Sequence, residues 1–202
     1  MLTYCHWDNA IEIDREYHDN EWGVPAFNDK RQFEFVFLEA MQCGLSWLLM
    51  LKKRSIFSNC FDNFDYKKIA CYTEKDVKRI MGTEGMIKSM QKIRAMINNA
   101  QCFLKIIEKY GSFCNFIWSY SDHKTILYTG HEKGVMPVTN GLAKKISKDL
   151  KKHGFKYFGP IVTYSHLQAC GIINDHSFDC PRFAEINSMN ETIKLEPDNE
   201  DY

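Results

Sequence analysis

The apolar residues of this chain recur at helical spacing over most of its length. The clearest segment starts at Met86, and its periodic apolar side chains are Met90, Ile93, Ile97, Leu104 and Ile107. These positions fall on one face of a helix, and Gly111 is placed to end it. Few segments alternate as strands do, and residues 122–137 show no period. We therefore expect an all-α fold with a surface loop over residues 122–137.

Capping residues indicate where several helices begin and end. Asp29 precedes an almost wholly apolar stretch and is placed to cap a helix buried on all sides. Thr73 and Asp76 have the spacing of a capping box. Gly154 suits the end of a basic amphipathic helix, and Pro160 suits the first turn of the helix that follows.

The composition suits one folded domain. The chain has 202 residues, of which 45% are hydrophobic and 14% aromatic, so a sizeable core is available and a mainly disordered chain is excluded. We expect residues 1–186 to form a single domain, with two helical lobes around one cleft as a variant. Residues 187–202 carry five acidic side chains against Lys194 alone, which predicts an acidic, disordered tail.

The charge distribution changes the first impression given by a net charge of zero. The 26 basic and 26 acidic residues become 25 and 21 once the tail is set aside, so a basic patch for nucleic acid is allowed. No apolar run reaches membrane-spanning length, and the first ten residues do not resemble a signal peptide. We expect a cytoplasmic protein with no membrane partner.

Four residues from the two chain ends form a candidate metal site. His176 and Cys180 are four residues apart, so one helical turn would let both face one ion. Cys5 and His18 would come from the other end of the chain. Four protein ligands leave no open position for water, which favours a structural ion that joins the termini. Spacing alone, however, favours four unrelated polar residues.

The segment from Gly154 to Pro160 is a candidate DNA-backbone site. A helix N-terminus offers unpaired backbone N–H groups and a positive dipole end, which suit a phosphate oxygen. Gly159 would permit close approach of a backbone, and Lys156 adds charge. An ordinary connection inside a helical domain explains the same pattern, and is the more common case.

Glu39 is an acid within an apolar stretch, and aromatic residues are frequent around it. A carboxylate there costs free energy unless something hydrogen-bonds it. Trp47 follows eight residues later, and Trp7, Tyr17 and Trp22 cluster near the N-terminus. A buried acid ringed by aromatics suits a purine flipped out of a duplex. A structural Glu paired with an Arg, with the aromatics in the core, is an equally good interpretation.

Together these stretches resemble the DNA-3-methyladenine glycosylase I family, the constitutive bacterial type. The similarity runs from Cys5 to Cys180 over long, dense motifs that make a chance match very improbable. The matching segments are CHW (5–7), YHDNEWGVP (17–25), LEAMQCGLSW (38–47), LKKR (51–54), HGFKYFGP (153–160) and YSHLQACGIINDH (164–176).

The resemblance implies a helix-hairpin-helix DNA glycosylase fold and a role for each candidate residue. The zinc ligands fall on Cys5, His18, His176 and Cys180. The base-recognition acid falls on Glu39. Tyr17 and Trp47 match the pocket aromatics and are expected to sandwich the base, with Trp7 and Trp22 as neighbours. The DNA-backbone contacts fall on Gly154, Lys156, Gly159 and Pro160.

The implied activity is hydrolytic excision of 3-methyladenine from alkylated double-stranded DNA by a monomer, leaving an abasic site. A glycosylase for another damaged base and a non-catalytic damaged-DNA sensor are the alternatives. A zinc hydrolase is disfavoured because four ligands leave no open coordination position. Ile161 and His166 depart from the family pattern, which usually has Thr and an apolar aromatic there, so DNA affinity is affected before activity. For Asp175 we expect a structural role beside the zinc.

Overall fold

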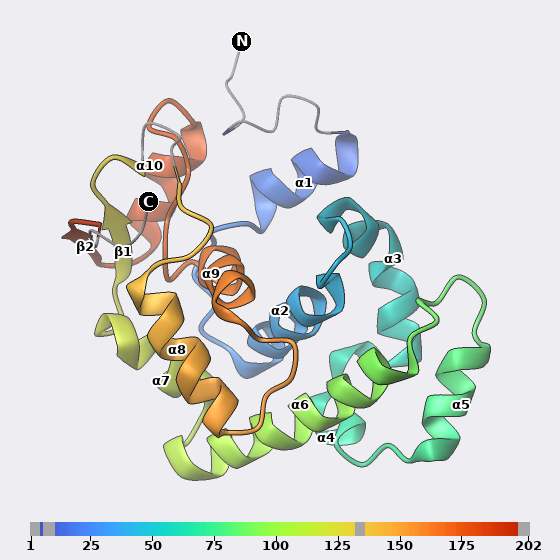
Figure 1. The fold of residues 1–202 in the computed structure, drawn as a ribbon. Helices are drawn as coiled ribbons and strands as arrows, with labels where there is room; N and C mark the ends of the chain where they lie inside the picture. The colour runs from blue at the N-terminus through green and yellow to red at the C-terminus, as the bar shows by residue number, and fades with distance from the viewer. Residues whose placement is uncertain (1–4, 6–10, 132–135, 198–202) are drawn as a thin grey trace.

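The computed structural model describes residue 5, residues 11–131 and residues 136–197, and this part of the chain is mostly helical (Figure 1). That confirms the main prediction from the hydrophobic pattern. The helices are α1 (Glu12–Asn20), α2 (Asp29–Gln42), α3 (Trp47–Cys60), α4 (Tyr66–Ile69), α5 (Glu74–Gly82), α6 (Met90–Tyr110), α7 (Phe113–Trp118), α8 (Gly141–Lys152), α9 (Pro160–Ala169) and α10 (Pro181–Met189). The remaining elements are the 3-10 turns η1 (Asp62–Phe64) and η2 (Ser119–Ser121) and the strands β1 (Thr125–Tyr128) and β2 (Thr192–Leu195).

Helix α2 lies near the centre of the molecule and contacts α3, α6, α7 and α9 (Figure 1). It is buried on all sides, as predicted, and its buried residues include Glu39. Its N-cap is Asn28, however, whose Oδ1 accepts from the backbone N–H of Arg31 at 2.8 Å. The predicted cap, Asp29, instead accepts from the backbone N–H of Cys114 at 2.9 Å and stabilises the start of α7.

The other predicted caps are confirmed. Thr73 and Asp76 form the capping box of α5, and Gly111 follows α6 with a φ of 83° that favours glycine. Gly154 has a φ of 91° just after α8, and Pro160 is the first residue of α9. Local capping chemistry is therefore sufficient to set the end of α8 and the start of α9.

The loop expected over residues 122–137 is wrong in part, because it contains strand β1. β1 pairs in parallel with β2, in the register Thr125 with Thr192 through Tyr128 with Leu195. The expectation of an all-α fold is corrected to a mostly helical fold with a two-stranded sheet. The strands are short and far apart in the chain, so the hydrogen bonds that form them leave no local period.

Part of the tail expected to be disordered has regular secondary structure. The expected boundary at residue 186 falls inside α10, and β2 follows it. The backbone N–H of Thr125 donates to the Glu191 carbonyl at 2.8 Å, and that of Thr129 donates to the Leu195 carbonyl at 3.0 Å. These bonds join the segment to β1 and its C-terminal end. Residues 198–202 lie outside the described part of the chain. None of the described helices combines the length and apolar character needed to cross a membrane.

Candidate functional site

Glu39 is buried in the core without compensation for one of its oxygens. The residue is 3% exposed, and its Oε2 has no hydrogen-bond partner among the described residues. Burial alone raises the pKa of Glu39 to about 8, because desolvation disfavours the charged form. The structural interpretation, a Glu paired with an Arg, is not what this site shows. An unpaired buried acceptor requires a reason, and a ligand is one.

Tyr17 on α1 and Trp47 at the start of α3 contact one another beside this acid. Their ring centroids are 5.1 Å apart and their planes are inclined at 53°. Burial, followed by the negative charge of Glu39, raises the pKa of Tyr17, which places the phenol within electrostatic reach of that carboxyl. The indole Nε1 of Trp47 is buried and, within the described residues, unpaired. The group therefore presents one free acceptor and one free donor.

The rings of Tyr17 and Trp47 leave no room for a base between them. A base stacked between two parallel rings needs about 7 Å, twice the van der Waals contact distance. The expected sandwich is therefore wrong for this conformation, and the two rings form adjoining walls. Two surface cavities, of about 410 and 450 Å³, have other linings that do not include Glu39.

Trp22 lies with the Cys/His cluster. Its ring centroid is 4.5 Å from that of His176 and 5.9 Å from that of His18, and its carbonyl accepts from Nε2 of His176 at 3.1 Å. These contacts assign it to the surroundings of the cluster, whereas we expected it beside the base. Trp7, the other expected neighbour, lies outside the described residues.

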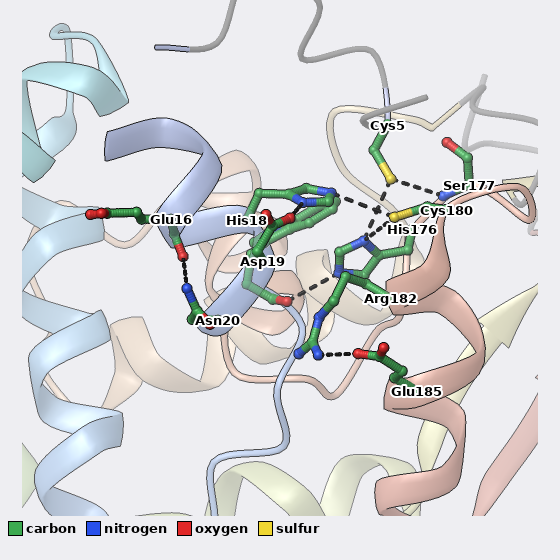
Figure 2. A network of polar contacts seen from close by, with 11 residues as sticks. Cys5, Glu16, His18, Asp19, Asn20, His176, Ser177, Cys180, Arg182 and Glu185 are labelled. Atoms are coloured by element: carbon green, nitrogen blue, oxygen red, sulfur yellow. Dashed lines mark hydrogen bonds and ion pairs between the residues drawn. The ribbon is translucent and has the colours of Figure 1, made fainter. Parts of the chain in front are cut away.

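The four candidate metal ligands converge in the folded chain (Figure 2). All four are buried, and their ligand atoms lie within 4.8 Å of one another. Sγ of Cys5 is 3.5 Å from Nδ1 of His176, and Sγ of Cys180 is 3.6 Å from the same atom and 3.8 Å from Nε2 of His18. Bonds of 2.0–2.3 Å in a tetrahedron separate ligand atoms by about 3.3–3.8 Å. The geometry thus fits one ion. The spacing of these residues along the chain had favoured four unrelated polar residues.

The outer contacts of the two histidines also fit metal ligation. Nδ1 of His18 is 2.8 Å from Oδ1 of Asp19, and Nε2 of His176 is 3.1 Å from the carbonyl of Trp22. Each ring therefore has one nitrogen in the cluster and the other on an oxygen acceptor, the usual arrangement of a ligating histidine. His176 and Cys180 are joined by a turn that precedes α10, in which the backbone N–H of Cys180 donates to the Ser177 carbonyl. We expected a helical turn between them.

Without a bound cation, the two thiols of the cluster have opposite pKa shifts. Burial opposes ionisation of Cys5, but hydrogen bonds from His176, His18 and Ser177 outweigh it and lower its pKa to about 5. Burial, then the neighbouring Cys5 charge, raises the pKa of Cys180. A cation among them would favour the thiolate form of both.

The hairpin of residues 154–159 is held by two adjacent asparagines of α6 that the sequence analysis missed. Nδ2 of Asn98 donates to the carbonyl of Gly154 at 2.8 Å. Asn99 is fully buried and pairs both ways with the backbone of Lys156, donating at 2.9 Å and accepting at 2.8 Å. Two consecutive Asn residues in an otherwise apolar-periodic helix were the available signal, since buried amides require partners.

The outer side of the hairpin faces open space. A Cβ added to Gly159 would meet no atom within 4 Å. Pro160 is exposed, and Ile161 next to it is 58% exposed. Exposed lysines extend from α8 into the hairpin: Lys144, Lys145, Lys148, Lys151, Lys152 and Lys156. The first turn of α9 and this basic face are accessible to an anionic partner.

Two further buried polar residues lie on α9 and in the segment after it. Asp175 accepts from Nδ1 of His131 at 2.7 Å, the hydroxyl of Tyr164 at 2.6 Å and Nε2 of Gln168 at 2.8 Å, so both of its oxygens are hydrogen-bonded within the fold. His166 is fully buried, and neither ring nitrogen has a partner among the described residues. Burial lowers the pKa of His166 to about 3.

His166→Phe should stabilise the protein, and the gain should grow as the pH falls. The folded state keeps His166 neutral down to about pH 3, whereas the unfolded chain takes up the proton near pH 6.5. The wild type therefore loses stability below pH 6.5, by about 2 kcal/mol at pH 5 from this residue. Melting temperatures of the wild type and the variant, measured from pH 8 to pH 5, give this difference. The control is His123→Asn, because His123 is exposed. Parallel curves for wild type and His166→Phe would contradict the assignment.

Sequence and structure comparisons give one consistent result. The methyladenine glycosylase family pattern matches residues 7–183. The chain is 39% identical over 179 residues to DNA-3-methyladenine glycosylase 1 of Escherichia coli, covering 89% of this chain and 96% of that protein. It is 40% identical over 182 residues to DNA-3-methyladenine glycosylase of Haemophilus influenzae, covering 90% and 98%. A solved structure of 3-methyladenine DNA glycosylase I from Staphylococcus aureus, described as the basis of 3-methyladenine recognition, superimposes with a TM-score of 0.84 at 35% identity, covering 89% and 96%.

Proposed function

This chain belongs to the methyladenine glycosylase family, and we propose from this premise that it excises 3-methyladenine from alkylated DNA. The observation that carries the proposal is the uncompensated carboxyl of Glu39 within electrostatic reach of Tyr17, whose ring contacts that of Trp47. A protein that only bound damaged DNA would have no need of a buried, unpaired acid. Its cost in stability is accounted for when the acid meets a cationic base.

Glu39 and Trp47 supply the polar contacts to the base. The Oε2 of Glu39 accepts from the 6-amino edge of adenine, and the Nε1–H of Trp47 is available to a ring nitrogen. An ionised Glu39 has acceptors only, so the carbonyl oxygen that guanine presents at the same edge would face a second acceptor, and guanine would be rejected. The unpaired donor and acceptor thus select the purine by its edge.

The positive charge of the lesion supplies the second selection. Methylation at N3 makes the adenine cationic, and the faces of Tyr17 and Trp47 attract a cation by about 0.5–2 kcal/mol per contact. Proximity to that charge also favours ionisation of Glu39, whose pKa burial has raised to about 8. Unmodified adenine lacks the charge, so it gains neither the attraction to the ring faces nor the interaction with an ionised Glu39.

The chemical step is hydrolysis of a bond that methylation has already weakened. The sugar acquires oxocarbenium character as the base leaves with the bonding electron pair, and becomes a neutral purine. The oxygen of water bonds to the anomeric carbon, and its proton passes to solvent. Asp175 accepts from three donors within the fold, so we assign it a structural role. We expect an abasic product and no lyase step.

The hairpin is proposed to hold the DNA backbone while the nucleotide is rotated out of the duplex. Together, α8, residues 154–159 and α9 would act as a helix-hairpin-helix motif, with phosphate at the start of α9. The open space at Gly159 and the exposed Lys156 support this assignment. Gly154 and Pro160 shape the turn on either side. Flipping costs a few kcal/mol, which these contacts offset.

The Cys/His cluster is proposed to hold a structural Zn²⁺ through Cys5, His18, His176 and Cys180. The ligand-atom separations and the outer contacts of both histidines support it. The ion would stabilise both thiolates and fasten the segment around Cys5 to the start of α10. We further propose a monomeric, cytoplasmic enzyme.

The proposed activity is tested by identifying the bases released from methylated duplex DNA. The purified protein is incubated with the DNA, and released bases are separated by chromatography. We expect release of 3-methyladenine with 7-methylguanine left in place. Release of several alkylated bases would keep the glycosylase and discard the account of selectivity. Binding without release would favour the damaged-DNA sensor.

A further inference from the structure

An ion-pair network joins the segments that carry the base pocket, and the proposed function does not use it. The guanidinium of Arg54 donates from Nη1 and Nη2 to the two carboxylate oxygens of Glu21, each at 2.8 Å. Its Nε donates to Glu34 at 2.8 Å. Arg31 also donates to Glu34, at 2.8 Å, and contacts Glu21. These side chains are 17–26% exposed, so the network is partly withdrawn from water.

The two principal partners lie on, or directly after, the helices that carry the pocket aromatics: Arg54 on α3, and Glu21 as the C-cap of α1. Glu21 is four residues after Tyr17 at the end of α1, and its backbone N–H donates to the Tyr17 carbonyl at 2.9 Å. Arg54 is seven residues, or two helical turns, after Trp47 on α3. The second spacing puts Trp47 and Arg54 on one face of α3. α1 and α3 therefore meet at two points, the ring pair and the ion pair.

The ion pair fixes how α1 sits against α3. Among the described helices, α3 is the one on which α1 chiefly packs. A bidentate guanidinium–carboxylate contact defines both a distance and an orientation, which an apolar contact does not. If α1 slid or rotated on α3, the ring of Tyr17 would leave that of Trp47 and its place beside Glu39.

We propose that Arg54, through Glu21, is a positioning residue that holds Tyr17 against Trp47 and so sets the shape of the base pocket. This inference rests on the proposed function, because it takes Tyr17, Trp47 and Glu39 as the base-binding group. It assigns a role to the LKKR segment that ends at Arg54. Arg54 acts on the base only through the aromatic pair.

The test compares Arg54→Lys and the isosteric Glu21→Gln with a matched control. Lys keeps the charge but loses the bidentate geometry. The control is Arg94→Lys, because Arg94 also makes a bidentate contact, from Nε and Nη2 to Glu74 at 2.8 Å each, between α6 and α5 and away from the pocket. Three quantities are measured well below each melting temperature: the affinity for free 3-methyladenine by calorimetry, kcat for base release, and the affinity for undamaged duplex.

Arg54→Lys and Glu21→Gln should each weaken free-base binding and lower kcat about tenfold, as expected for a misplacement of about 1 Å or less. Duplex affinity should not change, and Arg94→Lys should match the wild type in all three. A fall in melting temperature with unchanged base affinity and kcat would show a merely structural pair and overturn the proposal. Should Arg54→Lys not fold, Glu21→Gln decides alone, because Gln retains the shape of Glu. If the wild type neither binds nor releases 3-methyladenine, the proposed function fails independently of these variants.

Discussion

Glu39→Gln is expected to abolish most base excision while the protein remains folded. The amide has the shape of the carboxyl, so the packing of α2 is kept. It cannot become an anion beside a cationic base, and half of its polar edge turns from acceptor to donor. Losing one charge-assisted hydrogen bond of about 1.5–3 kcal/mol predicts a loss of about 10- to 100-fold in base release. Single-turnover excision of 3-methyladenine measures it. Near-normal rates would remove Glu39 from its role.

The same substitution should raise stability, and this separates a functional acid from a structural one. Burial raises the pKa of Glu39 to about 8, while the unfolded chain loses the proton near pH 4.3. Between these values the unfolded state is favoured by ionising, so the stability from the neutral carboxyl is fully present below about pH 4 and lost towards pH 8. Gln suffers no such loss. The variant should gain about 3–4 kcal/mol over wild type at pH 7 and almost nothing at pH 4. Denaturant titrations at both values decide it, and equal differences would contradict the burial account.

What the sequence predicted well is what local chemistry controls. The buried helix α2, the capping box of Thr73 and the turn between Gly154 and Pro160 each follow from residues within a few positions of one another. The metal ligands and Glu39 were identified through long family motifs, because their spacing alone left both interpretations open. Their convergence and the unpaired oxygen required the fold.

What the sequence did not predict depends on contacts between distant segments. β2 is ordered by β1, so its own polar sequence suggested a disordered tail. Asn99 resembles a surface residue until its pairing with Lys156 is seen. Trp22 is one of several aromatics near Tyr17 in the sequence, and only its contact with His176 separates it from the pocket. Each case depends on a contact with a residue far along the chain, and hydrophobic periodicity does not show which residues will be in contact.

Cys180→Ser is expected to lower both the zinc content and the thermal stability of the protein. A serine hydroxyl is a poor substitute for a thiolate ligand, and a structural zinc site contributes its binding free energy to folding. Because a large apolar core remains, the expected loss is about 3–5 kcal/mol, or about 10 °C in melting temperature. Atomic absorption gives the zinc per chain, and calorimetry gives the melting temperature. The exposed Cys71→Ser is the control and should change neither.

Metal removal distinguishes a structural ion from a catalytic one. The four candidate ligand residues are buried, and their ligand atoms lie within 4.8 Å of one another, so we expect a chelator to gain access only as the protein opens. Excision activity should therefore survive at first and then decline in step with the loss of folded protein, measured by circular dichroism on the same samples. Immediate loss of activity from a protein that is still folded would place the ion in the chemistry. One zinc per chain retained by Cys180→Ser would show that the ligand set itself is wrong. A slow, parallel decline would leave the base chemistry to Glu39 and the aromatic pair, and give the cluster the single task of joining two distant parts of the chain.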